Sequence, residues 1–251
     1  MITTIVNQKG GVGKTTTAVN LADGLARRDR RTLLIDLDSQ ANASVAMGFD
    51  KATTASGVAE ILFDGHPARE VIQSTGRDNL DIIAGHKRLA DADVLLSDEI
   101  GRESILKKRL KFIAGRYDHI IIDTPPSMGL LPINALVATD NYLIPVSPTN
   151  FALQGIQRIL ESIHKVKEGM DIDIPLFGIL LTMCDMRSKA TKDAIAQVRS
   201  DFNGQVFDSE IRINTRLNEA QGKGQTIYEY APDSTGATYY EAFTDEFIER
   251  I

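Results

Sequence analysis

The sequence has little cysteine, no long apolar run and no excess of positive charge. Cys184 is the only cysteine among 251 residues, which excludes a disulfide framework and a metal or cluster site built from two cysteines of one chain. No apolar run approaches the ~20 residues that a helix needs to cross a bilayer, and no basic leader precedes the first apolar segment. These absences predict a protein of a reducing compartment, cytoplasmic and neither secreted nor membrane-spanning.

The charge balance limits how the protein could meet nucleic acid. The 28 lysines and arginines against 34 aspartates and glutamates leave a formal net charge of −6. A protein that binds nucleic acid with its whole surface normally has a basic excess, so any DNA contact here must come from a local patch. At this length one large core is the expected arrangement, and we expect a single domain over residues 1–251.

Six short segments rich in Ile, Val and Leu do not alternate with polar residues. This pattern is typical of strands that are buried on both faces of a parallel sheet. Segments with helical spacing lie between them, and the β–α order predicts a doubly wound α/β fold with a mostly parallel sheet and helices on both faces. The predicted strands are 2–6, 32–35, 80–84, 119–122, 142–146 and 176–181, the predicted helices are 15–28, 103–114, 156–167, 189–202 and 236–251, and the predicted loops are 50–57 and 169–173.

The strongest motif lies between the first predicted strand and the first predicted helix and reads Lys9-Gly10-Gly11-Val12-Gly13-Lys14-Thr15-Thr16. Glycines let a backbone fold around phosphates, so that amide N–H groups and the helix N-terminus face the negative charge. In such a P-loop, Lys14 reaches the β- and γ-phosphates of a nucleotide and the hydroxyl of Thr15 can ligate Mg²⁺. The sequence therefore predicts a P-loop NTPase that binds a nucleoside triphosphate and Mg²⁺ through all eight residues of this motif.

Two further predicted strands end in acids. Asp36 and Asp38 follow the strand at 32–35, and Asp123 follows an isoleucine run. In a doubly wound sheet, ligands bind at the carboxyl ends of the strands, so carboxylates at those ends beside a P-loop lie at the expected binding site. The strand at 119–122 has the pattern of a Walker B motif, in which Asp123 holds the hydration shell of Mg²⁺. We expect Asp36 to support the Mg²⁺ or the loop, and the alternative for Asp36 is a helix N-cap.

Lys9 is the unusual element, because a plain P-loop needs no second lysine ahead of its glycines. With this lysine, residues 7–17 resemble the deviant Walker A motif of the ParA/MinD family of partitioning ATPases, closest to small, Soj-like ParA proteins without an N-terminal DNA-reading domain. The resemblance implies that Lys9 reaches across a homodimer to the phosphates of the partner's ATP, so that two chains sandwich two nucleotides. It also implies that Asp38 positions the attacking water, which makes Lys9, Lys14 and Asp38 the catalytic residues.

The resemblance extends over nearly the whole chain. Arg187 and Arg216 match arginines that bind DNA without sequence preference. Asn214 matches a contact to the nucleotide base, and Arg212, whose backbone lies where the family usually has a proline, belongs to the same nucleotide site. The chain departs from the family around 231–236, where Asp233 and Thr235 replace basic residues. This departure predicts weaker DNA binding than usual, or DNA binding by other basic residues, which are Lys189, Lys192, Arg199 and Lys223.

The resemblance predicts an ATPase that dimerises with ATP, binds nonspecific DNA of the nucleoid and hydrolyses ATP to segregate or position a plasmid, chromosome or protein assembly. It also predicts a ParB-like or adaptor protein that stimulates hydrolysis. One alternative, a MinD-like membrane switch, would need basic residues on the polar face of a C-terminal helix. Acids fill that face, so we expect no membrane contact; they are Glu241, Asp245, Glu246 and Glu249. The other alternative is a metabolic P-loop enzyme of the same superfamily, which would leave Arg187 and Arg216 without a role.

Overall fold

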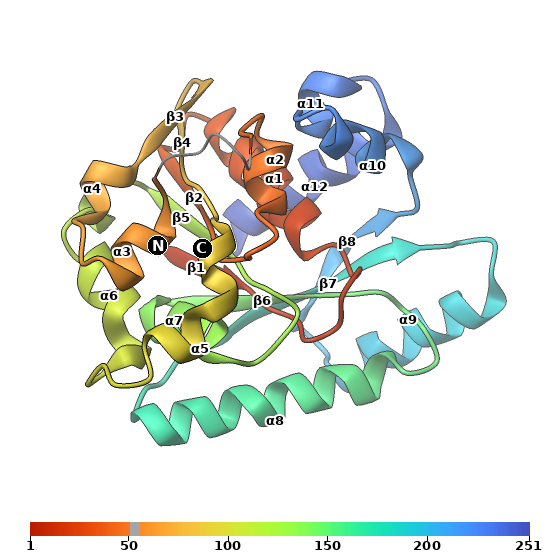
Figure 1. The fold of residues 1–251 in the computed structure, drawn as a ribbon. Coiled ribbons are helices and arrows are strands. Elements are labelled where there is room, and N and C mark those ends of the chain that lie inside the picture. Colours follow the sequence, from red (N-terminus) through yellow and green to blue (C-terminus); the bar gives the residue numbers. More distant parts are fainter. Residues whose placement is uncertain (51–55) are drawn as a thin grey trace.

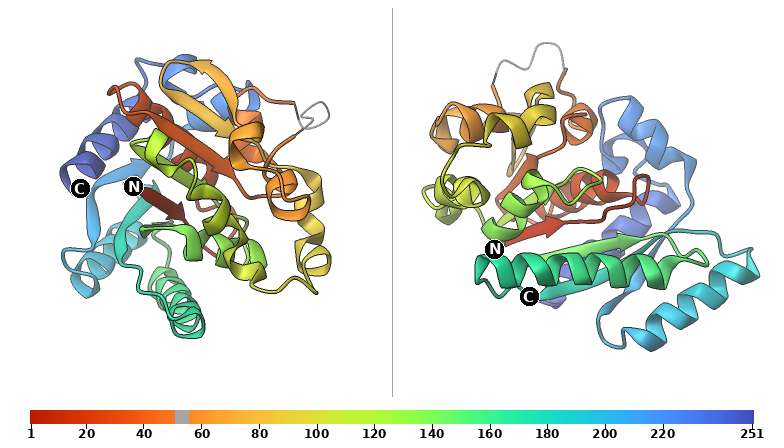
Figure 2. Two further views of the ribbon diagram at one scale, coloured as in Figure 1. Left: turned by 90° about the vertical axis from the view of Figure 1, so that its left-hand side faces the viewer. Right: turned by 60° about the horizontal axis from the view of Figure 1, so that its bottom comes forward.

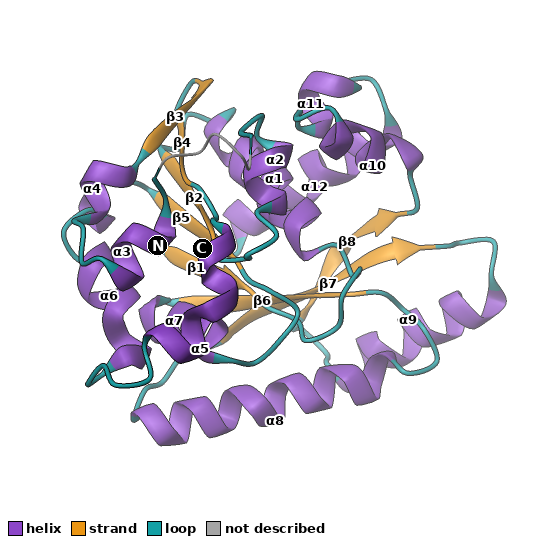
Figure 3. Ribbon diagram, viewed as in Figure 1, coloured by secondary structure: helices purple, strands orange, loops and turns teal. Residues whose placement is uncertain are grey.

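The computed structural model describes residues 1–50 and 56–251. In these residues eight strands form one sheet in the order β3-β4-β2-β5-β1-β6-β7-β8 (Figure 3). Neighbouring strands run parallel, except that β3 is antiparallel to β4. The strands are β1 (Ile2–Ile5), β2 (Thr32–Asp36), β3 (Gln73–Arg77), β4 (Leu80–Ile83), β5 (His119–Asp123), β6 (Asn141–Val146), β7 (Leu176–Cys184) and β8 (Val206–Arg212).

Helices cover both faces of the sheet (Figures 1 and 2). One face carries α1 (Lys14–Ala26), α2 (Asn42–Ala46), α10 (Thr215–Gly222), α11 (Ile227–Tyr230) and α12 (Thr235–Glu249). The opposite face carries α3 (Val58–Phe63), α4 (Ala68–Val71), α5 (Ala92–Leu95), α6 (Ile105–Leu110), α7 (Leu130–Ala138), α8 (Ala152–Met170) and α9 (Lys189–Asp201). Short 3₁₀ turns are η1 (Lys87–Asp91), η2 (Arg102–Ser104) and η3 (Ala114–Arg116). No helix in the described ranges has both the length and the apolar character to cross a membrane.

The strands are apolar at successive positions because they are buried on both sides. In β2, Leu34 packs into the cluster under α1 and α12, whereas Leu33 and Ile35 pack into the cluster under α3 and α6. Successive side chains of a strand point to opposite faces, so a strand with two covered faces needs an apolar residue at every position. The predicted α/β fold with a mostly parallel, doubly covered sheet is confirmed.

The strands that the sequence analysis does not predict lie at the two edges of the sheet, and the helices that it does not predict are α2, α3, α4, α5, α7, α10 and α11. Strand β3, with the sequence QSTGR, is polar and half-exposed, and β8 alternates between buried and exposed positions along part of its length. Neither has the continuous apolar run of a central strand. The predicted helix 103–114 is wrong in extent, because only α6 is α-helical there and 3₁₀ turns flank it. Most of the predicted loop 50–57 lies outside the described residues.

The order of the strands places a binding crevice beside the end of β1. Strand β1 lies between β5 and β6, and the chain moves to one side of β1 to form β2 and to the other side to form β6. In doubly wound sheets, ligands bind at the carboxyl ends of the strands where the strand order reverses in this way. The loop that follows β1 therefore lies where such a fold binds a ligand.

Gly178 in β7 provides a test of how tightly the sheet packs under α12. A Cβ atom added at Gly178 would lie 2.4 Å from Cε2 of Phe207, a residue that is 0% exposed. We expect Gly178→Ala to lower the free energy of unfolding by about 1–3 kcal/mol, measured by urea denaturation, because a buried ring must shift. As the control, Gly155→Ala in α8 meets no atom within 4 Å and should raise it by roughly 0.5–1 kcal/mol. Equal stability of the two variants would contradict this packing.

Candidate functional site

The loop between β1 and α1 has a backbone that only glycine adopts easily. Gly11 and Gly13 have φ angles of 71° and 81°, in the left-handed region where a side chain would be strained. The hydroxyl of Thr182, in β7, donates a 2.8 Å hydrogen bond to the carbonyl of Val12 and so holds the loop against the sheet. The free amides of the first turn of α1 lie at the end of this loop, where they can meet an anion.

Two lysines of the loop have opposite environments. Lys14 is buried, its ammonium lies 3.3 Å from the carbonyl oxygen of Lys9, and burial lowers its pKa against the raising effect of Asp123 and Asp38. Lys9 is exposed, and its ammonium makes no hydrogen bond or ion pair within the described ranges, although its backbone N–H donates to Oδ1 of Asn7 at 2.9 Å. Lys14 therefore serves its own loop, while the side chain of Lys9 is free to reach outside the chain.

A buried carboxylate faces the first turn of α1. The hydroxyl of Thr15 donates a 2.7 Å hydrogen bond to Oδ2 of Asp123, which is 0% exposed. Among the described residues, Oδ1 of Asp123 has no hydrogen-bond partner. Burial, and then the charge of Asp36, raises the pKa of Asp123 well above its usual range. Oxygen ligands of this kind, with a carboxylate atom still available, fit a hydrated Mg²⁺.

Asp36 holds the loop that follows β2. Its carboxylate accepts hydrogen bonds from the backbone N–H of Asp38 (3.1 Å) and from the N–H and hydroxyl of Ser44 (both 2.8 Å). The oxygen of Ser44 in turn accepts from the N–H of Gly85 at 2.9 Å, and burial raises the pKa of Asp36 to about 6. Because Ser44 lies in the first turn of α2, Asp36 caps that turn from the end of β2, although the N-cap residue of α2 is Ala41 and not Asp36 as the alternative above would have it. Its contact with Mg²⁺ stays a prediction.

Asp38 faces a cavity of about 530 Å³ beside the loop. Its carboxylate accepts a 2.9 Å hydrogen bond from the N–H of Gln40, and the residue is 8% exposed. The structure brings Asp38 together with Lys14, Thr15 and Thr16 around this cavity, and α2 and α10 complete its walls. Since a buried lysine and free helix amides point into it, the cavity suits a chain of phosphates.

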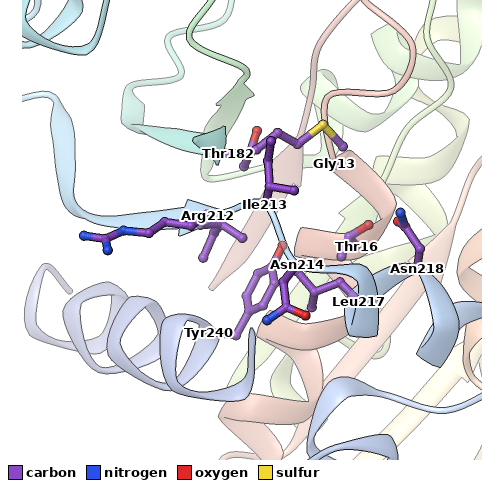
Figure 4. A pocket seen from close by; sticks show the side chains of 11 residues that line it. Gly13, Thr16, Thr182, Arg212, Ile213, Asn214, Leu217, Asn218 and Tyr240 are labelled. Atoms are coloured by element: carbon purple, nitrogen blue, oxygen red, sulfur yellow. The ribbon is translucent and has the colours of Figure 1, made fainter. Parts of the chain in front are cut away.

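A second cavity, of about 220 Å³, adjoins the first and has mostly apolar walls (Figure 4). Asn214 lines it, but its amide is already engaged: Oδ1 accepts from the N–H of Arg216 and Nδ2 donates to the hydroxyl of Thr235, both at 2.9 Å. The guanidinium of Arg212 points away from the cavity and lies over the ring of Tyr239 at 5.7 Å. The apolar walls suit a flat aromatic group and come from Met183, Ile211, Ile213, Leu217 and Tyr240.

The two arginines of the predicted DNA contact follow neighbouring strands. Arg187 lies just beyond β7, and Arg216 lies in the first turn of α10, which follows β8. Both are exposed, and each forms an ion pair, Arg187 with Asp185 at 2.9 Å and Arg216 with Glu219 at 2.8 Å. Their charges are therefore available at the surface but partly compensated.

Sequence reasoning missed three residues that shape the site. Ser44 joins Asp36 to Gly85, and Gln221 in α10 donates a 2.9 Å hydrogen bond from Nε2 to the hydroxyl of Thr16. Asn218, also in α10, lines both cavities. None of the three belongs to a motif, and only folding brings α10 beside the loop.

Comparison with known proteins gives consistent matches. A family model described as an AAA domain matches residues 1–176. The chain is 42% identical to the sporulation initiation inhibitor protein Soj of Bacillus subtilis, over 95% of this chain and 94% of that protein. It is 40% identical to the chromosome partitioning protein ParA of Myxococcus xanthus, over 98% of this chain and 87% of that protein. The structure of cobyrinic acid a,c-diamide synthase from Mycobacterium smegmatis with ADP and magnesium is 29% identical, with a TM-score of 0.84, and the match covers 97% of this chain and 92% of that one.

Ser44 tests whether the Asp36 network holds the loop. Ser44→Ala removes a donor to buried Asp36 and the acceptor for the N–H of Gly85, so we expect the free energy of unfolding to fall by about 1–3 kcal/mol. Urea denaturation measures it. Ser97→Ala, at an exposed serine whose hydroxyl makes no hydrogen bond in the described ranges, should change it by less than about 0.5 kcal/mol. A loss of stability no larger than that of the control would show that the hydrogen bonds of Ser44 do not hold this loop in place.

Proposed function

The chain belongs to the family of Soj and ParA partitioning ATPases, and on that premise we propose that it is an ATP-dependent dimerising switch that binds nonspecific DNA in its ATP state. It is an ATPase that works with ATP and Mg²⁺. Hydrolysis would release the dimer from DNA, and repeated cycles would segregate or position a cargo. The two adjoining cavities beside the P-loop carry the proposal, because one suits phosphates and the other suits a base.

Five residues in or beside the phosphate cavity have a role in this proposal. Lys14 binds the β- and γ-phosphates, and Thr15 and Asp123 hold Mg²⁺, which supplies positive charge to offset that of the phosphates. Asp38 orients the attacking water, a role that its place on the cavity wall supports. The capping of α2 by Asp36 fixes the loop on which Asp38 lies.

Lys9 supports the dimeric part of the proposal. Its side chain is exposed and its ammonium is unpaired in the described ranges, so the charge can act on a nucleotide held by a second chain. Two such lysines would close a homodimer around two ATP molecules. We propose that Lys9 acts in this way, in trans.

DNA is the proposed platform, and the nucleoid is the proposed location. Arg187 and Arg216 lie beyond neighbouring strands, and a dimer would present two copies of each. Doubling the contacts raises the effective concentration of the second set once the first is bound. A ParB-like or adaptor protein that stimulates hydrolysis completes the cycle, and the names of two relatives, a chromosome partitioning protein and a chromosome-partitioning ATPase, favour chromosomal DNA as the cargo over a plasmid or a protein assembly.

Binding to a membrane through the C-terminal helix is disfavoured, because α12 packs into the core. Its apolar residues Tyr240, Phe243 and Phe247 are at most 1% exposed. On its other face, Glu246 accepts hydrogen bonds from the backbone of β8, and Asp245 pairs with Arg28 at 2.6 Å. An interfacial helix needs an available apolar face and basic residues beside it, and α12 offers neither.

The likeness to cobyrinic acid a,c-diamide synthase favours a second candidate, an ATP-dependent small-molecule synthase. The identity to that protein is 29%, against 42% to Soj over a similar share of the chain. The two candidates differ in one property that can be measured, since a synthase has no need for DNA binding that depends on ATP.

The two lysines of the P-loop should separate binding from dimerisation. Lys14→Ala should weaken ATP binding by about 100-fold or more, because a buried, charge-assisted contact is lost. Lys9→Ala should keep ATP affinity within about threefold in the monomer, because the charge of Lys9 acts on the partner's nucleotide, and should abolish the ATP-dependent dimer. Calorimetry and sedimentation measure the two properties. A Lys9→Ala protein that dimerises as the parent does would remove the role in trans.

DNA binding should require ATP and should respond to salt. Log affinity falls with log salt at a slope of about −0.9 for each phosphate neutralised, so Arg216→Ala, which removes two contacts per dimer, should flatten the slope by roughly two. Titrations of random-sequence DNA with ATP, with ADP and without nucleotide measure it. Thr238→Ala, an exposed change of no charge, is the control. If the ATP-loaded dimer shows no salt-sensitive binding at low salt, DNA is not the platform.

A further inference from the structure

The phosphate cavity and the apolar cavity share four lining residues, and these mark where a nucleotide would have its sugar. The shared residues are Gly13, Thr16, Met183 and Asn218. In a nucleoside phosphate the sugar joins the base to the phosphates. If the P-loop cavity holds the phosphates and the apolar cavity holds the base, a premise that rests on the proposed function, the sugar lies against these four residues.

Asn218 has the unpartnered polar side chain at this junction. Gly13 has no side chain, Met183 offers a thioether, and the hydroxyl of Thr16 accepts the hydrogen bond from Gln221. Asn218 is exposed and its amide makes no hydrogen bond within the described ranges. Figure 4 shows its side chain extending from α10 on the side of Thr16. An amide supplies both an N–H donor and a carbonyl acceptor at this point.

Asn214, one helical turn earlier, cannot offer the same groups as readily. Its Oδ1 caps α10 through the N–H of Arg216, and its Nδ2 is bound to the hydroxyl of Thr235. Residues four apart lie on one side of a helix, so both asparagines face the cavity, but only Asn218 does so with an uncommitted amide. The two asparagines therefore have different tasks.

We propose that Asn218 binds the ribose hydroxyls of the nucleotide and makes the site favour ribonucleotides over deoxyribonucleotides. A ribose hydroxyl both donates and accepts, as an amide does, so the pair is complementary. A site with a group placed to bond a substrate hydroxyl binds the analogue without that hydroxyl less well. Because Asn218 remains accessible to water, the selectivity is modest and corresponds to one neutral hydrogen bond, a factor of about 3–10 in affinity.

Calorimetric titration of the full chain with ADP, 2′-deoxy-ADP and 3′-deoxy-ADP tests the proposal without hydrolysis. The parent should bind ADP about 3–10 times more tightly than at least one deoxy analogue. Asn218→Ala should weaken ADP binding by that factor and leave the affinity for that analogue within about twofold of the parent's. Thr215→Ala, an exposed change on the same helix that lines neither cavity, should keep the parent's preference.

The outcomes separate this proposal from the proposed function. Alanine has a higher helix propensity than asparagine, so Asn218→Ala should fold, and an unchanged melting temperature would verify it. A parent that binds all three nucleotides equally overturns the role of Asn218 while leaving nucleotide binding intact. An Asn218→Ala protein that weakens all three equally, or that keeps the parent's preference, does the same. A parent that binds none of them overturns the proposed function instead.

Discussion

The carboxylates of Asp36, Asp38 and Asp123 lie close enough to act on one another's charge, and Asp38 and Asp123 also act on the buried Lys14. The rest of the site depends on this concentration of negative charge. Burying like charges is costly, and the pKa values of Asp36 and Asp123 are raised mainly by burial. The hydrogen bonds from Ser44 and Thr15 offset part of this cost. A divalent cation beside Asp123 would offset more of it, which explains physically why a phosphate site should contain acids at all.

Helix α10 contacts this site through its last turn and has a surface arginine in its first turn. Its last turn contacts the P-loop helix through Gln221 and Thr16, and its first turn is capped by Asn214, which also bonds to the start of α12 through Thr235. Arg216 lies in that first turn. The helix that walls the nucleotide site thus also carries an arginine of the proposed DNA contact, so a shift of α10 on nucleotide binding would move that arginine.

The sequence was sufficient to predict the central part of the fold because β2 and its neighbours β4 and β5 are largely buried and contain runs of Leu and Ile. It was insufficient for β3, which is polar and half-exposed at one edge. The P-loop was predicted from the fixed spacing of its glycines around Lys14, and its acids were predicted from their place at the ends of strands. The sequence could not decide whether Asp36 supports Mg²⁺ or caps a helix, because the capping of α2 depends on a contact with Ser44 that only the folded chain makes.

Residues of α10 were the hardest to assign for the same reason. Asn214 was predicted to contact the base, and that prediction stays open, but the structure adds a capping role that its position as the first residue before α10 explains. Nothing in the sequence distinguishes Asn218 or Gln221 from other polar residues on an exposed helix. Their importance comes from the place where α10 packs, which no local pattern specifies.

The acidic character of the chain is compatible with the proposed DNA contact because its ion pairs are at the surface. Arg187 and Arg216 are paired with Asp185 and Glu219, and both guanidinium groups are more than half exposed. Exposed pairs of this kind contribute about 0–1 kcal/mol, so exchanging a carboxylate for a phosphate costs little. The net charge of −6 acts against binding at longer range, and salt screens it beyond about 10 Å at 0.1 M. A monomer would then gain too little from two arginines to remain on DNA, whereas a dimer with four arginines would gain enough. This difference would explain in physical terms why the proposed DNA binding depends on ATP.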